Sequence, residues 1–189
     1  MNLEFKNKLK YLSLLNAIIE PEWEYRYYSH NSNWAEDEEM SSLRDSCGGE
    51  WFIWYSRDLI AYKCTSPEDG VYEEFQQLID KVPDEYSSFK NESAFFMSHG
   101  SSIWYLKSGN WVQLGHAIND LPNPDTISKM TASDFCVFAE EMYEQELDES
   151  IIHNILNGDF SFEMAEKINP DIDLTSLKED MIDIGIINT

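Results

Sequence analysis

Most of the side chains in this sequence that are able to do chemistry are carboxylates. Among 189 residues, 36 are Asp or Glu and only 13 are Lys or Arg, so the formal net charge is −23. Two carboxylates that flank a substrate can act as general acid and general base. In so acidic a chain some pair of carboxylates is always present, so the sequence neither supports nor excludes an enzyme of this kind.

Metal ligands do not cluster in the sequence. It contains no C-x-x-C motif, no H-E-x-x-H motif and no two His at one helical spacing. Asp171 and Asp173 begin like a calcium-binding loop, but Ser176 stands where that loop requires Gly. We therefore expect no structural or catalytic metal.

Motifs for nucleotide binding and nucleophilic catalysis are also missing. The sequence has no Gly-rich fingerprint of a phosphate or dinucleotide site and no G-x-S-x-G motif. Cys47, next to Gly48 and Gly49, is a candidate nucleophile, although a single Cys is more often structural. We expect no cofactor and no catalytic residue, and we interpret the chain as a non-enzyme.

Charge and composition restrict the compartment and the partners. A strongly negative protein repels the phosphates of nucleic acid and anionic membranes. The apolar residues that follow Lys6, Lys8 and Lys10 are too few to span a membrane and precede no cleavage site, so an amphipathic helix is expected there. Three widely spaced Cys give no disulfide framework, which fits the cytoplasm.

The first two thirds of the sequence predict strands mixed with helices. Apolar residues at helical spacing predict a helix over residues 3–19, which Pro21 ends. Alternating aromatic residues at 23–28 predict a strand with one buried face, and 31–44 predict a loop that leads into a short helix at 38–43. The other expected elements are two hairpins, 51–55 with 59–64 and 102–106 with 111–114, a strand at 94–97 and a helical face at 71–82.

The last third of the sequence predicts helices only. Its helices are expected to start at four capping residues, Thr131, Asp148, Ser161 and Asp173 (or Thr175 for the last helix). The first of them has an apolar stripe that consists of Phe135, Phe138, Ala139 and Met142. The fold class is therefore α+β: a mixed, largely antiparallel sheet with flanking helices and an all-helical, acidic C-terminal tail. The prolines at 122 and 124 mark the seam between a sheet-containing region, 1–121, and a helical region, 122–189, packed on it as one structural unit.

The acidic residues concentrate in this tail. Residues 132–183 contain 15 acidic and only 2 basic residues, which is more than half of the net charge. Crowded like charges destabilise a fold, but they speed the capture of a basic partner. The alternative is that the acidity serves solubility alone.

Aromatic residues beside acids suit an interface anchor surrounded by charge. Trp34 lies next to such an acidic run. The predicted partner-binding residues are therefore Trp34, Glu36, Asp37, Glu38 and Glu39, together with Glu140, Glu141, Glu144 and Glu146 of the tail.

Three stretches that cover most of the chain form a recognisable pattern. They are WEYRYYSHNSNWAEDEEMSSLRDSCGGEWFIWY (23–55), SAFFMSHGSSIWYLKSGNW (93–111) and, within 139–186, YEQELDESIIHNIL and INPDIDLTSLKEDMIDIGI. The pattern resembles a family of uncharacterised acidic bacterial proteins with a YRYYSFNS-W-x-E-x-E-M-like segment and the same helical tail. The resemblance implies no catalytic residues. The acidic, cofactor-free character of that family is similar to that of immunity proteins for polymorphic bacterial toxins.

The expected function is therefore that of a cytoplasmic, non-catalytic protein-binding module, an immunity protein that neutralises a basic bacterial toxin. Its acidic helices and the segment around Trp34 would cover the basic active cleft of a toxin such as a nuclease. Two alternatives remain open. One is an unrecognised enzyme that uses a carboxylate pair in an aromatic cleft, and the other is a regulatory or scaffold protein.

Overall fold

The computed structural model describes residues 2–187, and the chain divides into two compact units. The first unit consists of Met1–His30 and Pro124–Thr189, and the second is Asn31–Asn123. The sequence-based division between residues 121 and 122 lies close to the observed boundary between residues 123 and 124. It differs at the N-terminus, because the first helix packs with the C-terminal helices and belongs to their unit.

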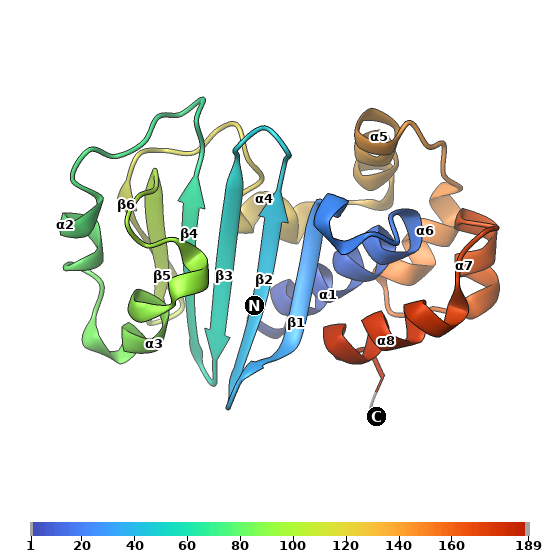
Figure 1. The fold of residues 1–189 in the computed structure, drawn as a ribbon, viewed down its shortest axis with the longest axis horizontal. Helices are drawn as coiled ribbons and strands as arrows, with labels where there is room; N and C mark the ends of the chain where they lie inside the picture. Colours follow the sequence, from blue (N-terminus) through green and yellow to red (C-terminus); the bar gives the residue numbers. More distant parts are fainter. Residues whose placement is uncertain (1, 188–189) are drawn as a thin grey trace. The chain divides into compact units, whose positions relative to one another are not determined.

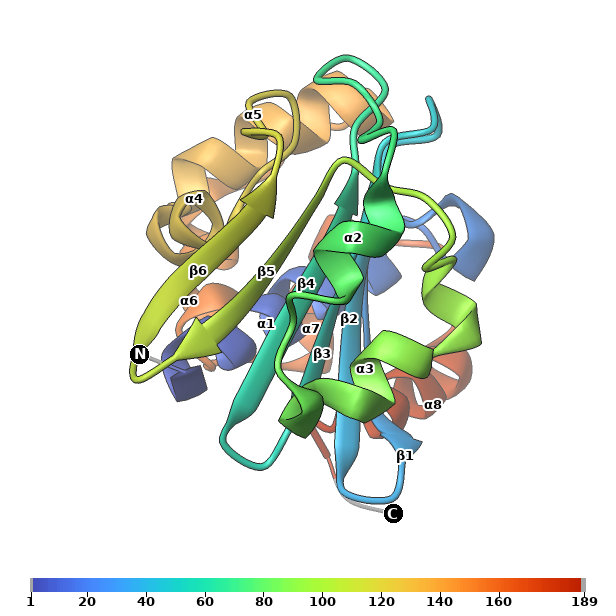
Figure 2. The ribbon, with the colours of Figure 1, turned by 90° about the vertical axis from the view of Figure 1, so that its left-hand side faces the viewer.

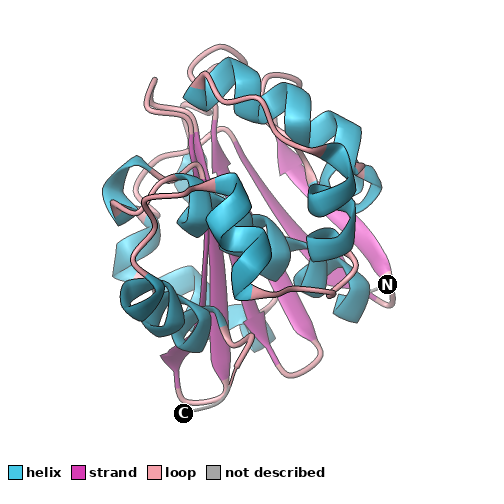
Figure 3. Cartoon of the chain, turned by 90° about the vertical axis from the view of Figure 1, so that its right-hand side faces the viewer, coloured by secondary structure: helices cyan, strands magenta, loops and turns pink. Residues whose placement is uncertain are grey.

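The first unit is helical. Its long N-terminal helix, α1 (Asn2–Ile19), lies against α4, α6, α7 and α8, and α5 packs on α6 (Figure 1). Figure 3 shows the chain from another side, with its helices in cyan. Leu9, Leu12 and Ile18 of α1 are fully buried. The C-terminal helices are α4 (Pro124–Lys129), α5 (Ala132–Tyr143), α6 (Glu149–Leu156), α7 (Phe162–Ile168) and α8 (Leu174–Ile184).

N-capping side chains determine where the helices of this unit begin. Thr131 and Asp134 form a reciprocal capping box at α5. The side chains of Asp148, Ser161 and Asp173 accept backbone N–H groups at the starts of α6, α7 and α8. Each cap satisfies a donor that the helix itself leaves unpaired, typically worth about 1 kcal/mol. All four helix starts predicted from the sequence are confirmed.

The second unit is built on an antiparallel meander. The order of the strands in the sheet is β1-β2-β3-β4-β5-β6, and every pairing from β2 to β6 is antiparallel (Figure 1). β1 begins in the first unit and continues into the second. The strands are β1 (Tyr28–Ala35), β2 (Glu38–Arg44), β3 (Glu50–Ser56), β4 (Leu59–Thr65), β5 (Ser102–Lys107) and β6 (Asn110–Gly115). The predicted α+β class and both predicted hairpins are confirmed.

Short helices of the second unit cover one face of its sheet. Figure 2 shows α2 (Phe75–Ile79) and α3 (Ser87–Asn91) in front of the strands. The indole of Trp54, on β3, lies 6.3 Å from the rings of both Tyr86 and Phe89. This core also includes Met40, Phe52, Ala61, Phe75, Leu78, Ile79, Val82, Phe95, Ile103 and Tyr105.

Three sequence-based expectations for the sheet region were wrong. Residues 23–28 are not a strand, because Trp23–Tyr25 form a 3-10 helix, η1, and β1 starts only at Tyr28. The expected loop and short helix at 31–44 are instead the hairpin of β1 and β2, which turns at Asp37 with a φ of 60°. Residues 94–97 contain the end of a 3-10 helix, η3 (Ser93–Phe95), and no strand. Charge and local polarity hid β1 and β2, because their strand conformation depends on pairing with neighbouring strands of the sheet.

A buried ion pair ties the N-terminal part of the first unit to α8. Nη1 and Nη2 of Arg26 lie 2.7 and 2.8 Å from the two carboxylate oxygens of Asp180. The Arg26 side chain is 6% exposed and also donates to the carbonyl oxygens of Glu20 and Pro21. A bidentate ion pair that is shielded from water stabilises the fold only when both charges are present, because either charge buried alone is destabilising.

Asp180→Ala is expected to lower the free energy of unfolding by about 3 kcal/mol, because it leaves the Arg26 charge buried without its partner. Glu179→Ala, at the exposed neighbouring position, should change it by less than about 0.5 kcal/mol. Urea unfolding followed by circular dichroism measures both. An equal, small effect of the two substitutions would contradict the role assigned to the ion pair.

A second buried cation lies inside the second unit. The side chain of Lys63, on β4, is 0% exposed, and its Nζ is 3.2 Å from Oε1 of Glu50 and 5.8 Å from the centre of the Phe52 ring. Burial lowers the pKa of Lys63, while the carboxylate of Glu50 opposes this shift. Holding the positive charge here therefore costs stability.

The cost of this charge should appear in the pH dependence of stability. Above the lowered folded pKa of Lys63 and below its usual value of 10.5, the unfolded chain binds more protons, so stability rises with pH. The free energy of unfolding of the wild type minus that of Lys63→Met should therefore rise as the pH approaches 10.5 and then level off. Denaturant unfolding over this range measures it, with Lys81→Met as the control for loss of an exposed charge. A flat difference for Lys63→Met would refute the pKa assignment.

Candidate partner-binding site

Two sets of carboxylates stand out in the helical unit, and the first serves the fold. Asp134 and Asp173 accept hydrogen bonds from backbone N–H groups at helix starts, and Asp148 accepts from the hydroxyl and then the N–H of Ser150; these bonds lower the pKa of each. Asp180 holds Arg26. Negative charge at a helix N-terminus also interacts favourably with the helix dipole, so these acids stabilise the unit.

The second group lies on α5 and just beyond it. Glu140, Glu141, Glu144 and Glu146 are all exposed, and among residues 2–187 their carboxylates have no hydrogen-bond or ion-pair partner. α5 turns Phe135 and Ala139 inward, which leaves these four glutamates toward solvent. We call them the α5 glutamates. Their mutual repulsion is not offset within the unit.

Met142 was expected in the buried stripe of α5, and this expectation was wrong. It is 40% exposed, because the helix ends soon after it, at Glu144 in a left-handed conformation. The end of α5 therefore presents an apolar side chain among the α5 glutamates.

The predicted acidic run at 36–39 is in the second unit, and two of its members have partners there. Asp37 Oδ2 lies 3.2 Å from Arg57 Nη2. Glu38 Oε2 accepts a hydrogen bond of 2.8 Å from Nε1 of Trp54. Glu36 is exposed at the turn between β1 and β2, and Glu39 is half-buried. The two predicted sets of partner-binding residues thus belong to different units.

An open, largely acidic hollow of about 690 Å³ lies at the tips of two hairpins in the second unit. Four carboxylates line it, and Trp54 forms part of its wall. The carboxylates are those of Glu36, Asp37, Asp58 and Glu85. Arg57 also lines the hollow and pairs with Asp37, so the other three carboxylates are the ones that could receive a further cationic side chain. The hollow is also where the alternative of a carboxylate pair in an aromatic cleft would have to operate.

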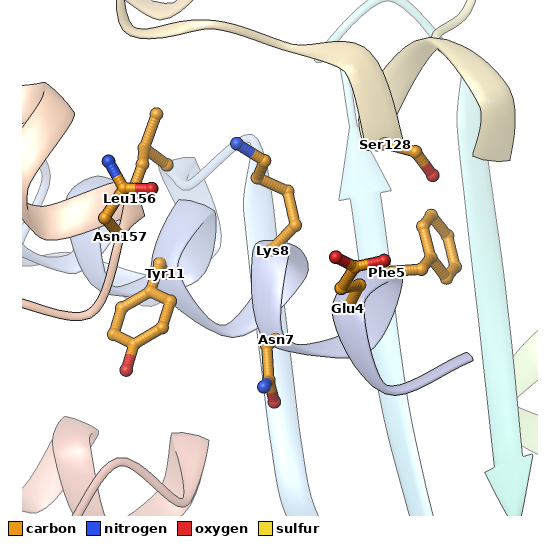
Figure 4. Close-up of a pocket in the computed structure, with 8 residues that line it drawn as sticks. All are labelled: Glu4, Phe5, Asn7, Lys8, Tyr11, Ser128, Leu156 and Asn157. Atoms are coloured by element: carbon orange, nitrogen blue, oxygen red, sulfur yellow. The ribbon is translucent and has the colours of Figure 1, made fainter. Parts of the chain in front are cut away.

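A second hollow, of about 500 Å³, lies in the first unit (Figure 4). Lys8 on α1 donates from Nζ to the carbonyl oxygen of Met130 at 2.9 Å, and burial lowers the pKa of its ammonium group. Glu4 is the one carboxylate among the residues that line the hollow. This hollow therefore does not supply a carboxylate pair. The other lining residues are Phe5, Asn7, Tyr11, Ser128, Leu156 and Asn157.

The cysteines and potential metal ligands are dispersed. Cys47 is exposed in the loop between β2 and β3, where its N–H donates to Asp45. Burial raises the pKa of Cys64 to about 12, so this thiol is not a nucleophile at neutral pH. Within residues 2–187, no group of three or more His, Cys, Asp or Glu is placed to hold a metal ion. No helix in the same part of the chain is long and apolar enough to cross a membrane.

Sequence reasoning missed two exposed aromatic residues. Trp23 and Tyr25 on η1 are 55% and 61% exposed, whereas the sequence predicted a strand with a buried face. The signal was present as P-E-W-E-Y, in which Glu22 and Glu24 alternate with the aromatics after a Pro. The acid-flanked aromatic that was expected at Trp34 thus has a more exposed counterpart here.

Comparison with known proteins gives no match to any family model, curated protein or solved structure. The assignment of function therefore depends on the residues and contacts described above.

Trp34 has a structural role in the second unit. Its indole stacks on Phe95 with ring centres 5.9 Å apart, and Nε1 donates to Glu92 at 3.2 Å. It packs against the core beneath α2 and α3.

Trp34→Ala is therefore expected to lower the free energy of unfolding by about 2 kcal/mol, because a half-buried ring leaves a gap over Phe95. Glu92→Gln, which keeps an acceptor for Nε1, should cost well under half as much. Thermal and denaturant unfolding measure both variants. A Trp34→Ala variant with unchanged stability would show that the side chain is available for a partner.

Proposed function

We propose that this protein is a non-catalytic binding module that captures a basic protein, and that it is an immunity protein for a bacterial toxin. The observation that supports this most directly is the set of α5 glutamates, which are exposed and uncompensated among the described residues. Acids in the same unit that stabilise the fold occupy helix starts or the Arg26 ion pair. The α5 glutamates do neither, so their mutual repulsion destabilises the unit and no structural contact compensates for it.

The proposed mechanism is stoichiometric covering of a basic cleft. An acidic surface attracts a basic protein over a distance of roughly a Debye length, about 8–10 Å at physiological salt, and raises the rate of encounter. Once bound, the module would exclude the substrate of the toxin, for example a nucleic acid. Such a protein would act in the cytoplasm, where the toxin would reach its target.

The second candidate is an enzyme that uses carboxylates of the hairpin hollow. The presence of Glu36, Asp58 and Glu85 around one hollow with Trp54 favours it over other enzyme hypotheses. Stoichiometry separates the two functions. A binding module protects a toxin target in proportion to the amount added, up to one molecule per toxin. An enzyme protects it at far lower amounts if it inactivates the toxin by turnover, and does not protect it at all if its substrate is another molecule.

Association with the toxin should be steered by charge. With the cognate toxin as the partner, to be sought among secreted effectors encoded near this gene, k_on should fall about tenfold or more from low to physiological salt. Replacing all four α5 glutamates by Lys should lower k_on to a similar degree at low salt, because the attracting surface is reversed. Stopped-flow fluorescence measures both.

The matched control for net charge is the substitution of Glu68, Glu73, Glu74 and Asp80 by Lys, four exposed acids of the second unit. This variant changes the charge of the chain equally, so it should affect k_on less than the α5 variant. Both variants should remain folded. Equal k_on values for the wild type and the α5 variant would mean that the tail acidity serves solubility alone.

A further inference from the structure

The segment that joins α1 to β1 displays two aromatic side chains on a short, ordered turn. Trp23 and Tyr25 are more than half exposed, and Glu22 and Glu24 alternate with them. The backbone is closed by hydrogen bonds from Tyr25 N to Glu22 O at 3.0 Å and from Arg26 N to Trp23 O at 3.3 Å. Large aromatic side chains usually bury most of their surface, so two of them, separated only by Glu24, on a surface turn call for an explanation.

Arg26 holds this turn from inside the unit. Its Nε donates to Glu20 O at 2.8 Å and its Nη2 donates to Pro21 O, while both Nη atoms bind Asp180 of α8. The guanidinium therefore joins the end of α1, the start of the turn and α8. A turn fixed in this way loses little conformational entropy when a partner binds to it.

The far end of the segment is held beside the C-terminal end of α5. Tyr143 OH accepts a hydrogen bond from Tyr27 N at 3.0 Å and donates one to Asn16 Oδ1 at 2.8 Å. The ring of Tyr27 packs edge-on against Phe138 of α5 at 4.8 Å. Tyr143 is the last residue of α5, directly between exposed Met142 and Glu144. The aromatic turn and the α5 glutamates thus belong to neighbouring parts of one unit.

We infer that Trp23 and Tyr25 are the central contact for the basic partner, and that they pack against its arginine side chains. This inference rests on the proposed function and names the recognised chemistry. Arg guanidinium groups stack on Trp and Tyr rings, and Trp, Tyr and Arg dominate the binding energy of protein interfaces. Glu22, Glu24 and the α5 glutamates would surround that contact with charge opposite to the partner's.

Charge complementarity decides between this occupant and a second copy of the chain. The chain carries a formal net charge of −23, and acids flank the aromatic turn on both sides. Two copies that met at this turn would bring like charges together, which is unfavourable. A basic surface gains from the same arrangement, so it is the occupant that the turn favours.

The test uses the full chain and a short arginine-rich peptide as the probe, with a citrulline counterpart as the uncharged control. The double variant Trp23→Ser, Tyr25→Ser should weaken binding of the arginine peptide by about tenfold or more. Phe96→Asn is the matched control, because Phe96 is 57% exposed in the second unit and Asn tolerates its left-handed backbone. It should bind like the wild type. In the wild type, the indole N–H resonance of Trp23 should shift when the arginine peptide is added and stay in place with the citrulline peptide.

The outcomes separate this inference from the proposed function. If the double variant binds the arginine peptide as tightly as the wild type while the α5 Lys variant binds it more weakly, the aromatic contact is refuted and the charge-based function stands. If the wild type does not bind the arginine peptide, or binds it without salt dependence, both fail. If sedimentation shows a wild-type dimer that the double variant loses, the turn is a contact between copies and the inference is overturned.

Discussion

The bidentate contact between Arg26 and Asp180 is the interaction on which the architecture of the helical unit depends. It joins residues 154 positions apart in the chain, and it links the end of α1 to α8 at the far end of the sequence. Asn16 makes a parallel link, because its Oδ1 accepts from Tyr28 N and from Tyr143 OH of α5. The N-terminal thirty residues are therefore fixed by polar contacts as well as by the apolar face of α1. Arg26 is the one base of the turn, and the fold uses it internally, so the surface of that turn is left with acids and aromatics.

The same chain illustrates how an acidic protein distributes its carboxylates. Where an Asp begins a helix, its charge meets unpaired N–H groups and lowers the energy of the fold. Where a Glu lies at the end of α5, it meets the negative end of the helix dipole and other acids, which is unfavourable. Solubility alone is achieved equally well by acids at favourable positions. The position of the α5 glutamates, rather than their number, therefore carries the argument for a partner.

Local signals in the sequence predicted the parts of the fold that local chemistry determines. The capping residues Thr131, Asp148, Ser161 and Asp173 predict the starts of their helices, and the runs of apolar residues around Trp54 and Tyr62 predict a hairpin. β1 and β2 were missed because Asn31, Glu38 and Glu39 are polar, and only their neighbours in the sheet make these residues strands. The grouping of α1 with the tail was equally hidden, since it depends on contacts such as that of Arg26 with Asp180.

The candidate site was predictable in chemistry but not in place. An aromatic residue flanked by acids was the right kind of feature to seek, yet the packing of Trp34 depends on Phe95 and Glu92, which lie far along the chain. The exposure of Trp23 and Tyr25, by contrast, is set largely by residues close to them in the chain. Pro21 ends α1, Arg26 turns inward to Asp180, and Trp23 and Tyr25 between them are left more than half exposed. Because this turn is held at both ends by polar contacts and alternates aromatic side chains with acids, a basic surface is the partner that we infer for it.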